Sequence, residues 1–426
     1  MASLDIVQTR SQFPSLKSGF IFGDNAGGSQ IAQEVIDRLN DYLINTNAQL
    51  GAEYSVSAES TRRVMKDAPT EAAKLFNARS PDEIVFAASS TLNLDNLARS
   101  LERKINDDAE IIVTGEHEAN VGPWKKLANR IQVGIKYWRA TPTKDSNPYS
   151  ISLKVEDVLP LITAQTRIVA FTACSNILGS IIPVKEYVKA IRARAAEVGA
   201  SQLEISVDCV AYAPHRKIDV QDWDVDYAVL SYYKVYGPHI SAMYVRQSAL
   251  RNSVSPLVHH FIKADDISYK LQPGGPGYET VYATTGVNQY LLSLTPANDL
   301  NASFAAIAAH EQTLVQPLIA FLTHPAQWER GVRLVGDDTV GLNRAPTISF
   351  VVVGPHAMQS KDVVKVFDAE GKAGIRWGHF YAYTLIDDLS PKLDVNDGVV
   401  RISLVHYNTV EDVQYITDTL QKVLQL

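Results

Sequence analysis

The residue whose chemistry most needs explaining is Lys234, in the stretch SYYKVYGPH at 231–239. It follows the apolar run 227–230 and precedes a Gly-Pro turn, so it stands at the end of an expected strand. A lysine in such a place is usually a solvated charge whose aliphatic stem covers apolar surface. Burial would instead disfavour the charged form and leave an amine that can attack a carbonyl. The polar groups that accompany Lys234 discriminate between these two interpretations.

Polar side chains follow several other expected strands, at the place where an α/β sheet binds its ligands. Asp208 ends the run LEISVD, His117 follows EIIVTG, and Asn176 lies in TACSNILGS. Ser90 and Thr91 open a helical stretch after EIVFA, and hydroxyls with free amides at a helix N-terminus form an anion site. Each of these residues alone has a commoner structural role, such as a helix cap or a loop position.

Taken together, these side chains match one chemistry. A phosphate cradle, an aromatic platform, a carboxylate and a lysine are the set that holds pyridoxal 5'-phosphate as a Schiff base. Motifs for other chemistries are missing from the sequence, which has no GxGxxG after a strand, no GxxxxGK[ST] and no HExxH. The pair His259-His260 lacks ligand spacing and a nearby carboxylate or thiol, so we expect no metal site.

The elements that must position these groups alternate between strand and helix. Six short β-branched runs recur between residues 83 and 246, and helical stretches such as 183–199 lie between several of them. Runs buried on both faces and joined through helices predict an α/β fold with a mostly parallel sheet between helices. Before them, residues 31–44 place apolar side chains, Leu43 among them, on one helical stripe, with Ser29 as the expected cap.

The pattern changes after about residue 300. A long Ala-rich helical stretch leads to three strand-like runs and a closing helix, which is an α+β arrangement. We therefore predict a large α/β domain over 15–295 and a small α+β domain formed by 1–14 and 296–426.

The composition excludes several classes of protein. The net charge of −7 over 426 residues gives no general attraction for nucleic acid or an anionic membrane. No apolar run approaches the roughly 20 residues of a spanning helix, and the start of the chain lacks the order of a signal peptide. We therefore expect a cytoplasmic protein without nucleic-acid or membrane partners. Two cysteines, Cys174 and Cys209, are too few for a disulfide framework.

Seven stretches carry a family resemblance and keep a fixed order and spacing along almost the full length. They are FGDNAGG (22–28), DEIVFAASSTLNL (82–94), EHEANVGPW (116–124), SNILGSIIPV (175–184), VDCVAYAPHRKIDVQDWDVDY (207–227), SYYKVYGPH (231–239) and VVRISLVHYNT (399–409). The chain resembles the class V aminotransferase-fold enzymes, specifically the cysteine desulfurase-like group that includes isopenicillin N epimerase-like proteins. The resemblance implies the type I fold of pyridoxal-phosphate enzymes, that cofactor, an amino acid substrate and a two-fold homodimer.

The resemblance also assigns roles to individual positions. Lys234 matches the lysine of the internal aldimine, Asp208 the partner of the pyridine nitrogen, and His117 the imidazole stacked on the ring. Positions that match the phosphate cradle are Ser90, Thr91 and Ser231, with Tyr233 where desulfurases often carry a histidine. Positions assigned to the substrate pocket are Asn25, Asn176, Tyr381 and Arg401. Of these, Arg401 is expected to clamp the substrate carboxylate in a bidentate pair.

Two departures from the family pattern bear on the reaction. Desulfurases of this group read Gly-His-His-Cys-Ala where this chain has GHFYA, so Tyr381 replaces the sulfur-accepting cysteine, and a phenol cannot form a persulfide. Cys174 and Cys209 are expected to be small core residues. Ala211 stands where relatives place Gln or His beside the cofactor, which widens the expected pocket. Further aromatic candidates for lining that pocket are Tyr54, Trp377, His379 and Phe380.

We therefore expect an enzyme that binds an α-amino acid as an external aldimine, with Lys234 removing a proton to give a quinonoid. The resemblance favours a cyclase-, lyase- or epimerase-type reaction of secondary metabolism, such as Mannich-type cyclisation in alkaloid biosynthesis, over desulfuration. Three alternatives stay open. They are a C–S or C–N lyase or an aminotransferase on the same residues, a cysteine desulfurase with a mobile thiol, and a catalytically silent binding protein of the same fold.

Overall fold

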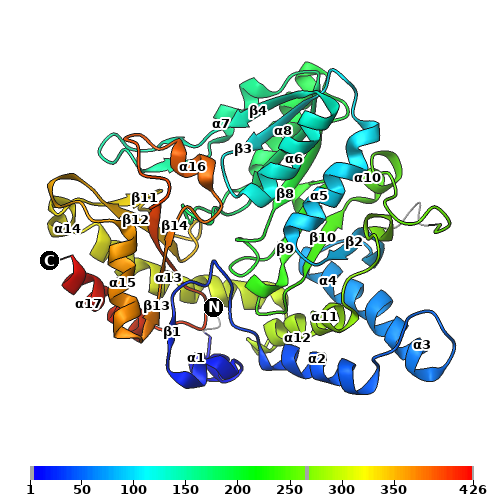
Figure 1. Ribbon diagram of the computed structural model, residues 1–426, viewed down its shortest axis with the longest axis horizontal. Helices are drawn as coiled ribbons and strands as arrows, with labels where there is room; N and C mark the ends of the chain where they lie inside the picture. The colour runs from blue at the N-terminus through cyan, green and yellow to red at the C-terminus, as the bar shows by residue number, and fades with distance from the viewer. Residues whose placement is uncertain (1–3, 264–267, 425–426) are drawn as a thin grey trace.

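The computed structural model describes residues 4–263 and 268–424, which form two main sheets of unequal size (Figure 1). The larger sheet has the order β2-β10-β9-β8-β7-β3-β4. Its strands are β2 (Ile84–Ala87), β3 (Glu110–Thr114), β4 (Gly134–Trp138), β7 (Thr166–Thr172), β8 (Glu204–Asp208), β9 (Tyr227–Ser231) and β10 (Ser241–Val245). The strands from β9 to β4 are parallel, and β10 lies antiparallel between β9 and β2. The predicted α/β fold with a mostly parallel sheet is confirmed.

Both faces of the larger sheet are buried. In β3, Ile111 and Val113 belong to one hydrophobic cluster, whereas Ile112 between them belongs to another. This division follows from the strand geometry, because successive side chains point to opposite faces. Helices that close the first face are α5 (Ser90–Leu101), α6 (Glu118–Ile131) and α10 (Gln247–Asn252), while α8 (Val184–Val198) and α9 (Val220–Trp223) close the second. The continuous apolar runs of the sequence therefore reflect burial on both sides.

The smaller sheet is antiparallel, in the order β11-β12-β15-β14. Its strands are β11 (Val332–Val335), β12 (Thr347–Val352), β14 (Arg376–Gly378) and β15 (Val399–Ser403). The helices that share its hydrophobic cluster are α13 (Leu300–Leu322), α15 (Ser360–Glu370) and α17 (Val410–Val423). Figure 1 shows this unit beside the larger sheet, with α13 between the two. Its arrangement is α+β.

The N-terminal segment pairs with the smaller sheet's unit. The short strand β1 (Ile21–Phe22) lies parallel to β13 (Ala373–Gly374), and Asp24 forms a bridge with Ser403. Ile21 packs in the hydrophobic cluster of the smaller sheet. The predicted division, with the large domain over 15–295, includes this segment and stays a prediction. A strand of two residues has no periodicity that a sequence pattern could reveal.

The helix expected over 31–44 is present as α2 (Gln33–Asn45), but two details differ. Its N-cap is Ala32, so the prediction of Ser29 as the cap was wrong. The Ser29 hydroxyl instead donates to the carbonyl of Tyr233 at 3.3 Å and accepts from the amide of Tyr236 at 3.0 Å. Leu43, assigned to the buried stripe, is 46% exposed. Ser29 thus ties the N-terminal segment to the loop that carries Lys234.

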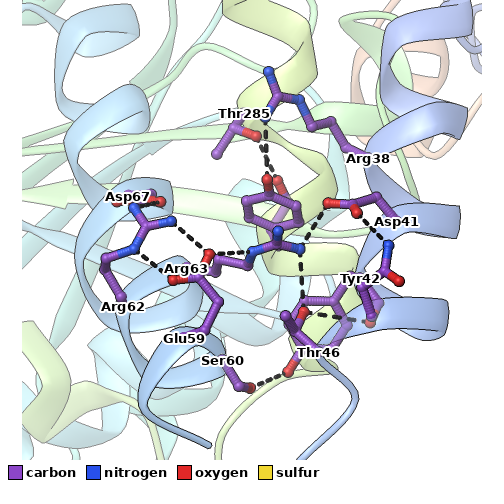
Figure 2. A network of polar contacts seen from close by, with 12 residues as sticks. Arg38, Asp41, Tyr42, Thr46, Glu59, Ser60, Arg62, Arg63, Asp67 and Thr285 are labelled. Carbon is purple, nitrogen blue, oxygen red and sulfur yellow. Dashed lines mark hydrogen bonds and ion pairs between the residues drawn. The ribbon is translucent and has the colours of Figure 1, made fainter. Parts of the chain in front are cut away.

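A group of charged side chains, which we call the arginine network, joins helices at the far end of the larger unit (Figure 2). Glu59 accepts from Arg62 at 2.7 and 2.8 Å and from Arg63 at 2.9 Å. Arg63 also donates to Asp41 at 2.7 Å, and its guanidinium lies 4.6 Å from the ring centroid of Tyr282. The elements joined are α2, α3 (Ser55–Arg62), the π-helical turn Arg63–Asp67 and α11 (Tyr278–Ala283).

Shorter elements complete the described chain. Further α-helices are α1 (Ile6–Ser11), α4 (Ala68–Phe76), α7 (Val155–Val158), α12 (Thr285–Ser293), α14 (Pro325–Glu329) and α16 (Tyr383–Asp387), and β5 (Thr141–Pro142) pairs with β6 (Ile151–Ser152). None of the helices within 4–263 and 268–424 combines the length and the apolarity that crossing a membrane requires.

Candidate active site

The carboxyl ends of the parallel strands β3, β7, β8 and β9 meet at one edge of the larger sheet, and the predicted groups follow these ends. His117 comes shortly after β3, Asn176 after β7, and Asp208 is the last residue of β8. Lys234 ends the 3-10 helix η6 (Tyr232–Lys234), which directly follows β9. Neighbouring parallel strands therefore bring together side chains that are far apart in the sequence.

His117, Asn176 and Lys234 line a cavity of about 520 Å³, a volume within the usual range of about 300–1,000 Å³ for ligand pockets. Asp208, Ser90 and Ser231 are not among its lining residues. Residues predicted for the site that line the cavity are Thr91, His117, Asn176, Tyr233, Lys234, Tyr381 and Arg401. Phe380 lines it too, whereas the other aromatic candidates, Tyr54, Trp377 and His379, are not among its lining residues.

Lys234 is a buried amine. Its residue is 5% exposed, and no hydrogen bond or ion pair reaches Nζ from the described residues. Burial is the main cause that lowers the pKa of Lys234 to about 8, and the positive charge of Arg401 adds to it, while Asp208 acts in the opposite direction. The solvated-lysine interpretation is therefore excluded, and a large neutral fraction is available near pH 8.

Asp208 is a buried carboxylate with an open oxygen. Oδ1 accepts from the amide of Val210 at 2.9 Å, while Oδ2 has no hydrogen-bond partner in the part of the chain that is described. Burial raises the pKa of Asp208, and the hydrogen bond from Val210 and the charge of Lys234 oppose that rise. A cationic partner would stabilise this carboxylate in its charged form.

His117 is held as a neutral imidazole. It is the N-cap of α6, and its Nδ1 accepts from the amide of Ala119 at 3.1 Å, so in the neutral ring the proton lies on Nε2. Burial, followed by the charges of Lys234 and Arg401, lowers the pKa of His117 to about 3. The ring centroid lies 5.5 Å from that of Tyr381. The imidazole can therefore present an uncharged face to a bound ring.

The predicted phosphate-binding hydroxyls lie at the start of α5 and at the end of β9. Ser90 is the first residue of α5, and the helix is capped by Ser89, whose side chain accepts from the amide of Leu92. Ser231 Oγ is buried without a hydrogen-bond partner among the described residues. A helix N-terminus with free amides and unpartnered hydroxyls suits a phosphate.

The guanidinium of Arg401 already donates to groups of this protein, which the sequence does not predict. It lies on β15 and is 1% exposed. Its Nη2 pairs with Asp24 at 2.7 Å, and Nη1 donates to the carbonyl of Asn176 at 3.2 Å. The ring centroid of Phe380 lies 3.7 Å from Cζ. The expected bidentate clamp is therefore partly occupied by this protein's own carboxylate.

Tyr381 lies at the mouth of the cavity on a strained loop. Phe380 and Tyr381 have φ values of 49° and 61°, in a region that bulky side chains rarely adopt. Two hydrogen bonds hold this loop, from Asn176 Nδ2 to the carbonyl of Phe380 at 3.0 Å and from the amide of Glu118 to that of Tyr381 at 2.8 Å. Tyr381 is 68% exposed and therefore accessible from solvent.

Asn25 was assigned to the substrate pocket, but the structure does not bring it there. Its Nδ2 donates to the carbonyls of Phe22 at 2.7 Å and Ser403 at 2.9 Å, and its Oδ1 accepts from the hydroxyl of Tyr407. It is not among the lining residues of the cavity. The amide is used to join the N-terminal segment to β15.

The sequence reasoning missed three charged residues at the site. Asp24 pairs with Arg401, and Arg376 Nη1 lies 3.6 Å from the other oxygen of Asp24. Glu116 Oε2 accepts from Ser175 Oγ at 2.8 Å, and burial, with a contribution from Asp208, raises the pKa of Glu116 to about 7. Asp24 lies in the stretch FGDNAGG and Glu116 in EHEANVGPW, both of which carry the family resemblance. An acidic residue inside such a stretch was the sequence feature that could have identified them.

The groups left open fit pyridoxal 5'-phosphate. Its aldehyde requires a neutral amine, which Lys234 provides, and its ring nitrogen requires a buried carboxylate such as Asp208. Its phosphate requires donors such as the unpartnered Ser231 hydroxyl. A buried polar group without a partner costs about 1–3 kcal/mol, so a bound phosphate that accepts from Ser231 would recover part of this cost.

Comparisons with known proteins agree with this geometry. A family profile described as aminotransferase class-V matches residues 21–416. The aminotransferase-like protein FGM3 of Gibberella zeae is 41% identical over 429 residues, covering 99% of each chain. The cysteine desulfurase-like protein ustD of Aspergillus flavus is 29% identical over 426 residues, covering 99% of this chain and 91% of that protein.

A solved structure gives the same fold. The apo cysteine desulfurase of Thermococcus onnurineus NA1 superposes with a TM-score of 0.82 at 20% identity, covering 100% of this chain and 99% of that one. Identity at this level supports the fold alone. The expected type I fold is thereby confirmed.

Proposed function

Because the chain belongs to the class-V aminotransferase family, we propose that it changes bonds at the carbon atoms of an amino acid substrate, with Lys234 as its catalytic amine. It is a pyridoxal-phosphate-dependent enzyme, as its class-V and cysteine desulfurase-like relatives are. The reaction is of the cyclase, lyase or epimerase type found in secondary metabolism, such as a Mannich-type cyclisation in alkaloid biosynthesis.

Each open group of the site would bind a different part of the cofactor. Lys234 would hold the aldehyde carbon, Asp208 the ring nitrogen, and His117 one face of the ring. The phosphate would be held by Ser90, Thr91, Ser231 and Tyr233. When bound, pyridoxal phosphate supplies an electron sink that stabilises negative charge on a substrate carbon.

Lys234 is suited to moving a proton. With its pKa at about 8, part of the amine is neutral near neutral pH, so Nζ can take a proton from the substrate Cα and return it. His117 carries no charge in this range, because its pKa lies at about 3. The imidazole therefore does not compete with Lys234 for that proton, and its role would be to position the cofactor ring.

Arg401 would orient the substrate through its carboxylate. Asp24 and the carbonyl of Asn176 already take one hydrogen bond each from its guanidinium. A substrate carboxylate therefore binds the remaining N–H groups or displaces Asp24. The displaced Asp24 stays paired with Arg376, which already lies 3.6 Å away, so no charge is left without a partner.

The observation that carries the reaction class is the state of the thiols. Tyr381 stands where desulfurases carry the sulfur-accepting cysteine, and both cysteines of the chain are buried. Burial raises the pKa of Cys174 to about 12 and that of Cys209 well above its ordinary value. A sulfur acceptor must be an accessible thiolate, so these residues favour chemistry at carbon.

A C–S lyase is the second candidate. It requires no thiol of the enzyme, and the similarity to a cysteine desulfurase-like protein over 99% of this chain favours a sulfur-containing substrate for it. An ordinary cysteine desulfurase would need a thiol from outside the described site.

A panel of amino acids added to the yellow holoprotein tests the proposal. We expect one class of amino acid to change the visible absorbance, and mass spectrometry of the trapped adduct to reveal a bond change at Cα, Cβ or Cγ. Sulfide release from cysteine above that of free cofactor would instead favour the second candidate. No spectral response to any amino acid would identify a silent binding protein.

We further propose a homodimer. The resemblance to class V aminotransferase-fold enzymes supports this state. Four large apolar side chains of α2 and the following segment are exposed in the single chain, namely Leu43, Ile44, Val56 and Met65. Light scattering should give twice the chain mass of 46.9 kDa. A mass of one chain at micromolar concentration would contradict the proposal.

A further inference from the structure

Tyr233 is fixed by its surroundings before any ligand binds. Its carbonyl accepts from the amide of Ser29 at 3.0 Å and from the Ser29 hydroxyl at 3.3 Å. The backbone of Gly28 comes so close that a β-carbon there would lie 3.3 Å from Cδ2 of the tyrosine ring. The ring lines the cavity, and its hydroxyl has no hydrogen-bond partner among residues 4–263 and 268–424. The backbone of Tyr233 is therefore held in place, and its phenol hydroxyl is a donor without a hydrogen-bond partner in the described chain.

His239 covers one face of that ring. The two rings are parallel within 3°, with centroids 4.9 Å apart. His239 is exposed and follows the Gly237-Pro238 turn, so its side chain has room to point into solvent. Its imidazole has no hydrogen bond to the described residues, and the stack on Tyr233 is the contact that orients it.

We propose that His239 is a positioning residue, which by stacking on Tyr233 holds the phenol hydroxyl toward the phosphate of the cofactor. The inference rests on the phosphate role proposed above for Tyr233. Burial raises the pKa of Tyr233, so its hydroxyl keeps its proton and donates to an anion. Without the stack, the Tyr233 ring would lose the contact on that face and become more mobile. The entropy cost of ordering the ring would then weaken cofactor binding.

The alternative is a purely structural stack that stabilises the turn after Lys234. The two explanations differ in one measurable respect. If His239 acts through Tyr233, its substitution matters only while the tyrosine is present. If it stabilises the turn, or contacts the phosphate itself, the effect persists without the tyrosine.

The test is a double-mutant cycle on cofactor retention in the full-length holoprotein. The variants are Tyr233→Ala, His239→Ala, His239→Phe and the double Tyr233→Ala/His239→Ala, with the exposed His356→Ala as a matched control. The first readout is the rate at which an unrelated apoenzyme regains its own activity by trapping released pyridoxal phosphate. The second is the phosphorus NMR shift of the bound phosphate. Thermal unfolding of each apoprotein checks the fold.

We expect His239→Ala to release the cofactor about 3- to 10-fold faster, the range that an aromatic pair provides, and to move the phosphorus shift. His239→Phe keeps the stack and should behave as the original protein does. In the Tyr233→Ala background, His239→Ala should add nothing, and His356→Ala should change neither readout.

Several results would overturn the inference. Unchanged release in His239→Ala rules out the positioning role, and so does equal weakening in His239→Ala and His239→Phe. An effect of the same size with and without Tyr233 means that the histidine acts independently. If Tyr233→Ala itself retains the cofactor normally, the phosphate role of Tyr233 fails, and this outcome is distinct from a failure of His239 alone.

Discussion

Two polar clusters of this protein differ in how completely their hydrogen bonds are made. In the arginine network, Arg62 and Arg63 each donate to two carboxylates, and Glu59 accepts from both (Figure 2). At the active site, Lys234 is a buried residue whose Nζ makes no hydrogen bond or ion pair within the described chain, and Ser231 Oγ is buried without a hydrogen-bond partner there. The charged groups of the arginine network are satisfied by one another, whereas a buried hydroxyl without a partner, such as that of Ser231, costs about 1–3 kcal/mol.

The two clusters also treat charge in opposite ways. Hydrogen bonds from Arg62 and Arg63 lower the pKa of Glu59 to about 2 and so favour its charged form. Burial lowers the pKa of Lys234 to about 8 and so favours its neutral form. The network is therefore expected to respond to mutation through stability, and the active site through chemistry.

The largest effect should come from Lys234→Ala. Removal of the amine should abolish covalent attachment of the cofactor and lower turnover by at least about a thousandfold, since both attachment and proton transfer are lost. The apoprotein should keep its fold, because the amine of Lys234 makes no hydrogen bond or ion pair within the described chain. Borohydride reduction with peptide mapping measures the attachment. A reduced adduct elsewhere in the chain would contradict the assignment, and Lys74→Ala, whose lysine pairs with Glu71, is the control.

The pH dependence of cofactor capture should give the next largest effect. Below pH 8 the amine of Lys234 is mostly charged and does not attack an aldehyde. The rate of capture by the apoprotein should therefore rise about tenfold per pH unit up to pH 8 and then level off. Stopped-flow absorbance measures it. A rate that keeps rising toward pH 10.5 would indicate an ordinary solvated lysine.

Arg401→Lys tests an intermediate case, because Arg401 is partly paired and partly open. The lysine keeps the charge but loses the fork of donors, so KM for the amino acid should rise at least about tenfold while the cofactor spectrum stays unchanged. Arg63→Lys is the matched control in the arginine network, where KM should not move. If both variants left KM unchanged, Arg401 would not bind the substrate.

The smallest effect should come from Glu59→Gln. Its salt bridges are partly exposed, so the substitution should lower the free energy of unfolding by no more than about 1 kcal/mol and leave cofactor binding intact. Because the folded pKa lies below the ordinary 4.5, the difference from the original protein should be full above pH 4.5 and vanish as pH falls toward 2. Urea unfolding at several pH values measures it, and a difference that persists at pH 2 would exclude this ion pair as the cause.

Much of the site could be predicted from sequence because its residues follow strand ends or occupy spaced motifs. Asp208, His117 and Lys234 are examples, since each comes at or just after an apolar run that became a parallel strand. The pairing of Arg401 with Asp24 could not be predicted, because the two residues are 377 positions apart and no local period connects them. Asn25 fails for a related reason, since its partners Ser403 and Tyr407 lie at the other end of the chain.

The N-terminus of α2 is a second place where contacts between distant residues limit what the sequence predicts. The helix after residue 30 was visible from its apolar stripe, but its cap was misplaced because the Ser29 hydroxyl bonds to Tyr233 and Tyr236 instead of to the helix. The helix-capping preference of serine describes a bond to its neighbours in sequence, whereas here the Ser29 hydroxyl bonds to residues about 200 positions away.

The parallel pair of β1 and β13 has a consequence for synthesis of the protein. Ile21 leaves the ribosome about 350 residues before its partner Ala373, and at about 5–20 residues per second this is a delay of about 18 to 70 seconds. During that time the nascent chain carries an unpaired N-terminal strand, and Asp24 lacks Arg401 for slightly longer, because 377 residues separate the two. A competent catalyst therefore cannot exist before translation is almost finished, whatever the larger sheet has achieved by then.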